Sequence, residues 1–350
     1  MPHTQFVSVL MPVRNDASHI ERSLSAVLRQ DYPRDRMEII VADGLSDDGT
    51  RDVIEAFQLQ NPNVRLIDNP GKIVSTGLNT ALRVAKGEII IRVDGHCEVA
   101  SDYVRLCVAH LTEADIDCVG GPLETLGETY VASAIAAAMS STFGVGGAAF
   151  RVGTQADRLV DTVAFPAYKR ETIRQAGDFD EELVRNQDDE YNYRVRKLGG
   201  RILLSPDIRA RYYSRSSLFK LWKQYLQYGY WKVRVMQKHP LQMQLRQFVP
   251  ALFIIALGAL LTTAPFLVVN QWLLLATLIA YTVLCLAASV SAAAKTDWRL
   301  LPLLPIAFTI IHFAYGSGFL LGLIKFWNRW RDHGPRASQS SLQRDVAPLQ

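Results

Sequence analysis

The sequence lacks several features that would assign a function at once. It has four cysteines, and no two of them form a Cys-x-x-Cys pair, so no zinc or redox site is indicated. They are Cys97, Cys107, Cys118 and Cys285, and we expect buried thiols in a reducing compartment. The first residues, MPHTQFVSVLMPVRND, show no basic segment followed by a long apolar one, which argues against a signal peptide. We therefore expect the N-terminal part to stay in the cytosol.

Two further absences exclude classes of function. The formal net charge of +4 is too small to indicate a nucleic-acid partner. No G-x-G-x-x-G follows the first apolar run, although a pyrophosphate bound at the start of the next helix would require one. A dinucleotide-binding oxidoreductase is therefore excluded.

Charged residues are absent from two long C-terminal stretches. Residues 249–294 contain none, which is enough for two membrane spans of about 20 residues each, with a turn near Asn270-Gln271. Residues 300–324 form a second uncharged run. Tryptophans lie near the ends of these runs, as in aromatic belts: Trp272, Trp298, Trp327 and Trp330. The sequence therefore predicts two or three transmembrane helices within residues 248–325.

Basic residues cluster before and after these stretches. Residues 201–247 hold ten Lys or Arg and one acid, Asp207, which favours an anionic membrane surface over a plain solvated face. Three spans would put the polar tail, 326–350, outside, although the positive-inside rule would keep the basic residues there inside. Those residues are Lys325, Arg329, Arg331 and Arg336. One of the three hydrophobic segments is then re-entrant or interfacial. The third segment, within residues 300–324, is our candidate because it holds Pro302, Pro305, Gly316, Gly318 and Gly322.

The first two hundred residues alternate between strand-like and helix-like segments. The patterns predict strands at 6–12, 37–42, 64–67 and 88–93, and helices at 17–30, 50–59 and 76–85. This alternation indicates a parallel sheet covered on both faces, with ligands at the carboxyl ends of its strands. The polar residues at those ends are Arg14, Asn15, Asp43, Ser46, Asp94 and His96.

Two other segments bear on the domain boundary. Residues 133–150 are rich in alanine and glycine, and we expect a helix and a glycine loop inside the N-terminal domain. Residues 217–238 repeat aromatic and apolar residues at helical spacing, with basic residues on other faces. This pattern fits either a helix in the membrane interface or a helix packed in the core.

The strand-end motifs together resemble one known family. VSVLMPVRND, IIVADGLSDDGT and RVDGH resemble the family 2 glycosyltransferases, over residues 5–235. The RVDGH arrangement, the segment FGVGG and the hydrophobic C-terminus further resemble the succinoglycan-biosynthesis (ExoA-like) glucosyltransferases. The resemblance implies an α/β catalytic domain at residues 1–240 with the GT-A fold, a Rossmann-type nucleotide-sugar domain.

The resemblance also implies a donor site. Asp43 would bind the uracil ring of the donor, because a carboxylate accepts a hydrogen bond from a ring N–H, although Asp43-Gly44 also fits a simple turn. The other matching positions near the nucleotide are Pro12, Arg14, Asn15, Lys72 and Asn79. Lys72 would neutralise diphosphate charge, or it is a solvated surface lysine.

Asp94-Gly95-His96 stands where the family has its Asp-x-Asp metal motif. A divalent cation compensates the charge of a departing nucleoside diphosphate. Imidazole in place of the second acid suits Mn²⁺ better than Mg²⁺, which favours oxygen ligands. The resemblance therefore implies a divalent metal, Mn²⁺ or Mg²⁺, at Asp94 and His96, with Gly95 beside the donor. The alternative is a strand-end turn with a hydrogen-bonded histidine.

The segment NQDDE, residues 186–190, with Arg194 downstream, resembles the family's Glu-Asp motif. The spacing to Arg194 places Asp188 at the position of the family's catalytic aspartate. Gln187 stands where the family has Glu, and Asp189 is the second candidate for the catalytic aspartate. Such a base would take the proton from the acceptor hydroxyl as it attacks, and one displacement would invert the anomeric carbon. The acids of this segment also suit the positive end of a helix.

Together these implications predict an inverting hexosyltransferase in the inner membrane, multi-pass, with its catalytic domain in the cytoplasm. The donor would be UDP-glucose and the acceptor a polyprenyl-linked oligosaccharide of an exopolysaccharide or cell-surface glycan. Two alternatives stay open. One is a polyprenyl-phosphate glycosyltransferase. The other is a non-catalytic membrane scaffold, which is compatible with Gln187 and His96 because each replaces an acidic residue of the family's motifs. A processive synthase is disfavoured because QYGYW, residues 227–231, has no Arg before Trp231.

Overall fold

The computed structural model describes residues 5–331 and divides them into two compact units. Unit 1 comprises residues 5–124 and 153–212, and unit 2 comprises residues 125–152 and 213–331. The sequence predicted one domain over 1–240, whereas the structure groups 125–152 and 213–240 with the C-terminal helices. Most of the predicted tail, including Arg336, lies outside the described residues.

One half of the main sheet of unit 1 is parallel, as predicted. Its strands lie in the order β3-β2-β1-β4, and they are β1 (Val7–Val13), β2 (Met37–Asp43), β3 (Val64–Asp68) and β4 (Ile89–Arg92). Every residue of β1 and β4 is buried, which explains their continuous apolar sequences. The register pairs Val13 with Asp43 and Asp43 with Asp68, so the carboxyl ends of these strands meet at one edge.

The other half of the sheet is mixed. It continues β9-β6-β10-β8, with β6 (Cys118–Gly121), β8 (Arg158–Leu159), β9 (Ala164–Lys169) and β10 (Ile202–Leu204). Strand β9 is antiparallel to both β4 and β6, so the sheet is mixed beyond the four strands that the sequence predicted. A small second sheet has the order β5-β11-β7, with β5 (Cys97–Val99), β7 (Leu123–Leu126) and β11 (Ala210–Tyr213).

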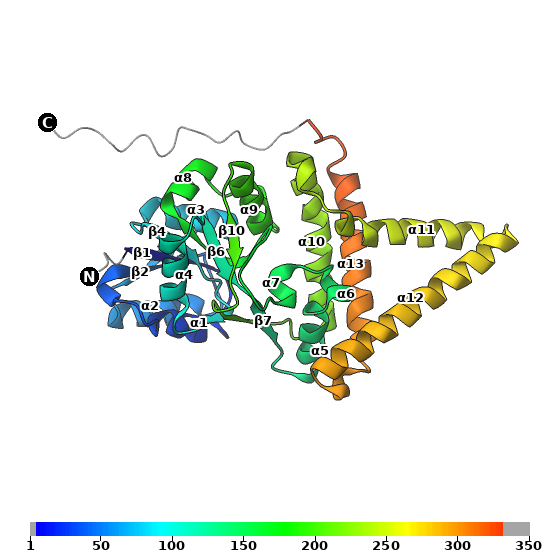
Figure 1. Ribbon diagram of the computed structural model, residues 1–350, viewed down its shortest axis with the longest axis horizontal. Helices are drawn as coiled ribbons and strands as arrows, with labels where there is room; N and C mark the ends of the chain where they lie inside the picture. Colours follow the sequence, from blue (N-terminus) through cyan, green and yellow to red (C-terminus); the bar gives the residue numbers. More distant parts are fainter. Residues whose placement is uncertain (1–4, 332–350) are drawn as a thin grey trace. The chain divides into compact units, whose positions relative to one another are not determined.

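Helices surround the main sheet of unit 1 (Figure 1). They are α1 (Ile20–Leu28), α2 (Thr50–Gln60), α3 (Val74–Val84), α4 (Tyr103–Glu113), α8 (Arg170–Ala176) and α9 (Gln187–Lys197), with the short turn η1 (Arg34–Arg36). The three helices predicted from periodicity are confirmed, with shifted ends. For example, α1 buries Ile20, Leu24 and Val27, which recur at helical spacing. The three cysteines of this unit are buried free thiols, as expected.

Unit 2 is helical. Its helices are α5 (Tyr130–Met139), α6 (Thr142–Val145), α7 (Ala149–Val152), α10 (Leu218–Lys238), α11 (Val249–Thr263), α12 (Val268–Lys295) and α13 (Leu304–Lys325), with the turns η2 (Pro240–Gln242), η3 (Leu245–Gln247) and η4 (Trp298–Leu300). Two of them, α12 and α13, are long and apolar enough to cross a membrane, and α11 is shorter. Helix α5 buries seven of its ten residues and lies against α13, which explains why an alanine-rich segment belongs to this unit.

Helices α10 and α13 pack along each other at very short range (Figure 1). A Cβ atom on Gly318 would stand 2.0 Å from the Leu226 carbonyl oxygen, and one on Gly229 would stand 2.0 Å from the Tyr315 carbonyl oxygen. The glycines allow the two backbones to touch, as small residues do at close helix crossings. Helix α10 is therefore largely a packed helix, although Phe219 at its start is 75% exposed.

The turn between the first two apolar helices differs from the prediction. It lies at residues 264–267, ahead of Asn270-Gln271. Pro265 explains the difference, because proline lacks an N–H and disfavours helical conformation in the residue before it. Asn270 and Gln271 are instead in the first turn of α12.

We predict that Gly318→Ala destabilises unit 2. Its Cβ would force the two helices apart, and such overpacking costs about 1–3 kcal/mol of unfolding free energy. Gly258→Ala in α11 is the matched control, because a Cβ there meets nothing within 4 Å. Thermal unfolding of the purified protein should show a lower midpoint for Gly318→Ala and an unchanged or higher midpoint for Gly258→Ala. Equal midpoints for the two variants would contradict the close packing.

Candidate active site

The loops after β1 and β2 are joined by side-chain hydrogen bonds. Asn15, whose backbone has a positive φ of 51°, donates its N–H to the Ser46 hydroxyl at 2.9 Å. Its carboxamide exchanges hydrogen bonds with Asp47, at 2.9 Å to the carboxylate and 3.1 Å from the backbone N–H. The structure therefore brings Asn15, Asp43 and Ser46 together, as their strand-end positions suggested.

Asp43 is completely buried within this loop pair. Ser46 donates to both of its oxygens, at 2.5 and 3.0 Å, and Arg51 donates to Oδ2 at 3.0 Å. Arg51 also pairs with Asp68 on the next strand, at 2.8 Å. Both oxygens of Asp43 are thus engaged in shaping the loop, and its contact with a nucleobase stays a prediction. Of its predicted neighbours, Pro12 is buried in β1 and Arg14 is exposed, lying over Gly44.

The other two predicted donor residues lie on and just before α3. Lys72 is exposed and has a positive φ of 61°, so its ammonium group is open to solvent or ligand. Asn79 is buried, and its carboxamide bonds Phe179 and Glu181 at 2.8–2.9 Å. Asn79 therefore anchors the segment that leads into α9, and its contact with the nucleotide stays a prediction.

Asp94 is held by the last residue of β4. Arg92 donates from Nε to Oδ1 at 2.8 Å and from Nη2 to Oδ2 at 3.0 Å, which is the bidentate geometry that aligns a carboxylate most firmly. The Arg92 side chain is 7% exposed and that of Asp94 is 17% exposed. The pair therefore lies at the edge of the core, with the carboxylate reaching the surface.

The charge of Arg92 links Asp94 to Asp188. Burial lowers the pKa of Arg92, but the carboxylates of Asp94 and Asp188 reverse this effect and raise it above its ordinary value. Burial raises the pKa of Asp94, and the adjacent guanidinium of Arg92 outweighs burial and lowers it. His96 and Arg185 add to this lowering. One buried cation thus serves both the predicted metal ligand and the predicted base.

His96 is oriented by a second acid. Its Nδ1 lies 3.2 Å from Asp16 Oδ2, and its ring meets Tyr212 edge-on with 5.3 Å between centroids. A Cβ on Gly95 would approach Asp16 Oδ2 and Val13 Cγ1 to 2.8 Å, so a larger residue there would displace these side chains. His96 is therefore hydrogen-bonded, as in the alternative interpretation of this strand-end turn. The contact with Asp16 uses Nδ1 and does not involve Nε2.

The predicted base lies in the first turn of α9. Asn186 precedes the helix with a positive φ of 62°, and Asp188 accepts the backbone N–H of Asp189 at 2.9 Å. Farther along the helix, Glu190 is buried in a bidentate pair with Arg194, at 2.7 and 3.0 Å. Arg194 also donates to the carbonyl oxygens of Ala176 and Asp178, which fixes the start of α9 on the segment before it.

Comparison with known proteins identifies the family. The chain is 31% identical over 324 residues to the succinoglycan biosynthesis protein ExoA of Rhizobium meliloti, covering 92% of this chain and 96% of that protein. Residues 8–130 match the family model described as glycosyl transferase family 2. The chain belongs to glycosyltransferase family 2. The RVDGH and strand-end motifs had indicated this resemblance, which is confirmed.

Two further relatives extend over most of this glycosyltransferase. A dolichyl N-acetyl-alpha-D-glucosaminyl phosphate 3-beta-D-2,3-diacetamido-2,3-dideoxy-beta-D-glucuronosyltransferase of Methanococcus voltae is 26% identical and covers 91% of this chain and 98% of that protein. The mannosyltransferase PcManGT of Pyrobaculum calidifontis, solved with GDP-Man and Mn²⁺, superposes with a TM-score of 0.58 at 21% identity, covering 93% of this chain and 88% of that one. The fold is that of GT-A glycosyltransferases, as expected.

The residues at the strand ends of this glycosyltransferase fit a cation that is partly bound by substrate. Within residues 5–331, no three His, Cys, Asp or Glu side chains form a group that could hold a metal. Ions such as Mg²⁺ are commonly bound by one or two carboxylates together with substrate phosphates. The side chains of Asp94 and His96 are 17% and 24% exposed, and each Asp94 oxygen keeps a lone pair beyond its bond to Arg92.

Sequence reasoning missed Arg92, Asp16 and Arg51 in this glycosyltransferase. Arg92 was quoted within RVDGH but given no role, although a charged residue that ends the apolar strand EIIIR is a signal of a buried ion pair. Asp16 reaches His96 across 80 residues of sequence, and Arg51 reaches Asp43 from the first turn of α2, 8 residues away. No local pattern announces such contacts.

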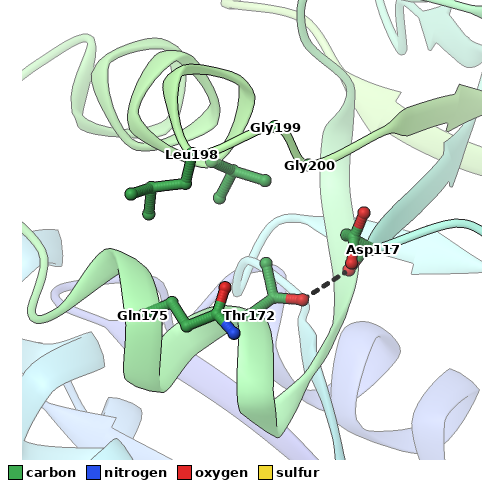
Figure 2. Close-up of a pocket in the computed structure, with 7 residues that line it drawn as sticks. Asp117, Thr172, Gln175, Leu198, Gly199 and Gly200 are labelled. Carbon is green, nitrogen blue, oxygen red and sulfur yellow. Dashed lines mark hydrogen bonds between the residues drawn. The ribbon is translucent and has the colours of Figure 1, made fainter.

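A hollow in unit 1 lies away from these residues (Figure 2). It is lined by Asp117, Thr172, Gln175, Val195, Leu198, Gly199 and Gly200. Thr172 donates to the Asp117 carbonyl oxygen at 3.4 Å. Leu198 and Asp188 are at opposite ends of α9, about 15 Å apart at the rise of an α-helix. The hollow contains none of the predicted site residues, so the candidate active site remains the strand-end cluster.

We predict that Arg92→Met destabilises the glycosyltransferase in a pH-dependent way. Asp94 has a lowered pKa in the folded protein, so its contribution to stability is present above its unfolded pKa and is lost as pH falls through the folded value. Without Arg92, the partly buried carboxylate is uncompensated near neutral pH, at a cost of about 1–3 kcal/mol. The pKa of Asp94 then rises in this variant, so protonation of Asp94 at acid pH reduces the loss of unfolding free energy.

Urea unfolding at about pH 7 and about pH 4.5, on either side of the range in which a perturbed carboxyl titrates, checks this prediction. The difference in unfolding free energy between wild type and Arg92→Met should be smaller at the lower pH. Arg83→Met is the control, because Arg83 forms an exposed pair with Glu181 at 3.9 Å and should cost less than about 1 kcal/mol. A deficit of Arg92→Met that does not change with pH would contradict the linkage of Arg92 to Asp94.

Proposed function

We propose that this chain is an inverting glycosyltransferase that moves a hexose from a UDP-sugar to a lipid-linked oligosaccharide. The observation that carries the proposal is the bidentate pair of Arg92 with Asp94 at the carboxyl edge of the sheet, where the negative charge of Asp188 also raises the pKa of Arg92. Ligands of open α/β sheets lie at this edge. Two acids that interact with one buried cation can serve two different roles: one beside the diphosphate and one beside the acceptor.

The diphosphate end of the donor would lie over Asp94. Asp94 and His96 would hold a divalent cation, Mn²⁺ or Mg²⁺, which supplies compensation for the charge of the leaving diphosphate. The structure solved for PcManGT contains GDP-Man and Mn²⁺, which supports this choice for a GT-A fold. Lys72, exposed beside α3, would add a positive charge near the same group. Asp43, through Ser46 and Arg51, would shape the loops that receive the nucleoside.

Asp188 would act as the general base. The acceptor hydroxyl oxygen attacks the anomeric carbon, and the bond from that carbon to the diphosphate oxygen breaks. The hydroxyl proton passes to the Asp188 carboxylate, and UDP leaves with the bonding electron pair. Because one displacement occurs from the face opposite the leaving group, the configuration of the anomeric carbon is inverted. Asp189, the next residue of the same helical turn, is the reserve candidate.

The acceptor and location are proposed from the relatives and unit 2. The Methanococcus voltae relative is named for transfer to a dolichyl-phosphate-linked sugar, and the Rhizobium meliloti relative for succinoglycan biosynthesis. Helices α12 and α13 are apolar enough for a membrane. These observations support a lipid-linked glycan acceptor and a place at a membrane. Glucose as the donor sugar, the inner membrane and a cytoplasmic catalytic unit are proposed from the family resemblance alone.

We predict that Asp188→Asn abolishes transfer while leaving donor binding intact. The amide keeps the size of the side chain but cannot accept the proton, and loss of a general base costs about 10²–10⁴-fold in rate. UDP release and sugar transfer would be measured with membranes containing the full chain, a panel of UDP-sugars, and Mn²⁺ or Mg²⁺. Asp189→Asn is the matched control and should retain transfer.

Three results would count against the proposal. Transfer to plain polyprenyl phosphate alone would replace the oligosaccharide acceptor with the lipid phosphate. Loss of activity in Asp189→Asn alone would move the base by one residue. Failure of every UDP-sugar to bind, with Asp188→Asn indistinguishable from wild type, would leave a non-catalytic scaffold.

A further inference from the structure

Helices α11 and α12 form a hairpin that extends away from the rest of unit 2 (Figure 1). The hairpin spans residues 249–295, and no Asp, Glu, Lys or Arg occurs before Lys295. Most of its apolar side chains are exposed, with only Ala251 buried in α11 and four residues buried in α12. An apolar surface of this extent on a soluble molecule marks contact with a membrane or another protein.

The tip of the hairpin is apolar, and its two amide side chains each donate a hydrogen bond within the hairpin. Phe266, Val268 and Val269 are 83%, 65% and 69% exposed. Asn270 donates to the Thr263 hydroxyl at 2.7 Å, and Gln271 donates to the Ala264 carbonyl oxygen at 3.0 Å. The backbone N–H groups of Phe266 and Leu267 also bond the Thr263 carbonyl oxygen. Such a tip suits hydrocarbon, where polar groups must find internal partners.

The first arm of the hairpin is too short to cross a bilayer. Helix α11 has 15 residues, which span about 22 Å, whereas the hydrocarbon core is about 30 Å thick. The start of α11 is fixed against α13, because a Cβ on Gly316 would stand 2.5 Å from the Pro250 carbonyl oxygen. The tip can therefore reach past the middle of the core without emerging on the far side.

Basic residues of unit 2 lie at the base of the hairpin. Arg246 precedes α11, Lys295 ends α12 and Arg299 follows it in η4. This distribution fits a base that rests on anionic headgroups, which attract Lys and Arg. It also favours lipid over a second copy of the chain as the cover of the hairpin, because the sides and tip offer no charged side chain to fix a protein register.

Helix α13 stays at the base with α10. Gly318 and Gly322 lie against the backbone of α10 at Leu226 and Tyr230, so the two helices run side by side. The end of α13 meets Arg234 of α10, whose guanidinium bonds the Arg329 carbonyl oxygen at 3.4 Å and lies 5.7 Å from the Phe326 ring centroid. If α13 crossed the bilayer, α10 would enter it too, together with Lys223 and Lys232, and cations inside hydrocarbon are costly.

We propose that the α11–α12 hairpin is a re-entrant wedge that ends inside the hydrocarbon of an anionic bilayer. Ser217, where α10 begins, and Lys325, where α13 ends, then lie on the same side. The wedge replaces the multi-pass arrangement expected from the sequence, and it keeps Lys325, Arg329 and Arg331 on the side that the positive-inside rule requires. The proposal concerns membrane insertion alone and does not depend on the proposed reaction.

Cysteine labelling in sealed vesicles tests the wedge. The full chain carrying Cys285→Ala is reconstituted in vesicles of phosphatidylcholine and phosphatidylglycerol. The other three cysteines are fully buried and their pKa is raised by burial, so they react slowly. A membrane-impermeant maleimide is then applied to Val269→Cys at the tip, Asn328→Cys after α13, and Leu59→Cys, which is 89% exposed in unit 1.

Leu59→Cys measures the fraction of molecules with unit 1 facing outward. Asn328→Cys should label to the same extent. Val269→Cys should label about tenfold less than Leu59→Cys, both in sealed vesicles and after permeabilisation that leaves the bilayer intact, because a thiol in hydrocarbon does not ionise. It should label fully in denaturing detergent. Phe266→Cys is the second tip variant should Val269→Cys fail to insert.

Three outcomes would overturn the proposal. Labelling of the tip from the side opposite Leu59→Cys would show that the hairpin crosses. Labelling of Asn328→Cys only after permeabilisation, in the molecules whose Leu59→Cys faces outward, would show that α13 crosses. Disulfide cross-linking of Val269→Cys between two copies, with protection retained in mild detergent, would show that a second copy covers the tip.

Discussion

The guanidinium of Arg92 is the group on which the arrangement of the active site depends. A cation buried at the end of a strand is stable only if carboxylates compensate it, because the cost of removing a charge from water is several kcal/mol. Asp94 provides a bidentate partner two residues later, and Asp188 provides a second negative charge from the start of α9. The end of β4 and the start of α9 are therefore coupled by charge.

The rest of unit 1 positions the two acids around that cation. Asn79 and Ser75 on α3 bond the segment at residues 179–183, which leads towards α9. Arg194 fixes the helix to the same segment through the carbonyl oxygens of Ala176 and Asp178. The parallel register of β1, β2 and β4 then brings the loops with Asn15 and Ser46 to the edge at which Asp94 stands. The site is thus assembled from several separate parts of the chain, each held by hydrogen bonds.

The sequence predicted the parts of this structure that depend on local pattern. Strand β1 and helix α1 follow from period and burial, and the family follows from motifs at strand ends. The antiparallel strand β9 was missed because its direction is set by its partners β4 and β6. The structure groups the segment at 133–150 with the C-terminal helices, because its small residues pack closely on α13, which no local signal reveals. The pair of Arg92 with Asp94 has a local signal, a charged residue that ends an apolar strand, whereas the interaction of Arg92 with Asp188 has none. By contrast, the glycines of α13 were noticed, and the structure shows that they allow contact with α10.

The central claim is that Asp94 is a charged ligand at the diphosphate end of a nucleotide site. Titration calorimetry of UDP binding to the purified protein, with and without Mn²⁺, compares wild type with Asp94→Asn, whose amide keeps the shape of the side chain and removes its charge. The account predicts that Mn²⁺ strengthens UDP binding to wild type by at least about tenfold, equivalent to about 1.4 kcal/mol, and that Asp94→Asn loses this gain. Equal strengthening of UDP binding in both proteins, or none in either, would contradict it.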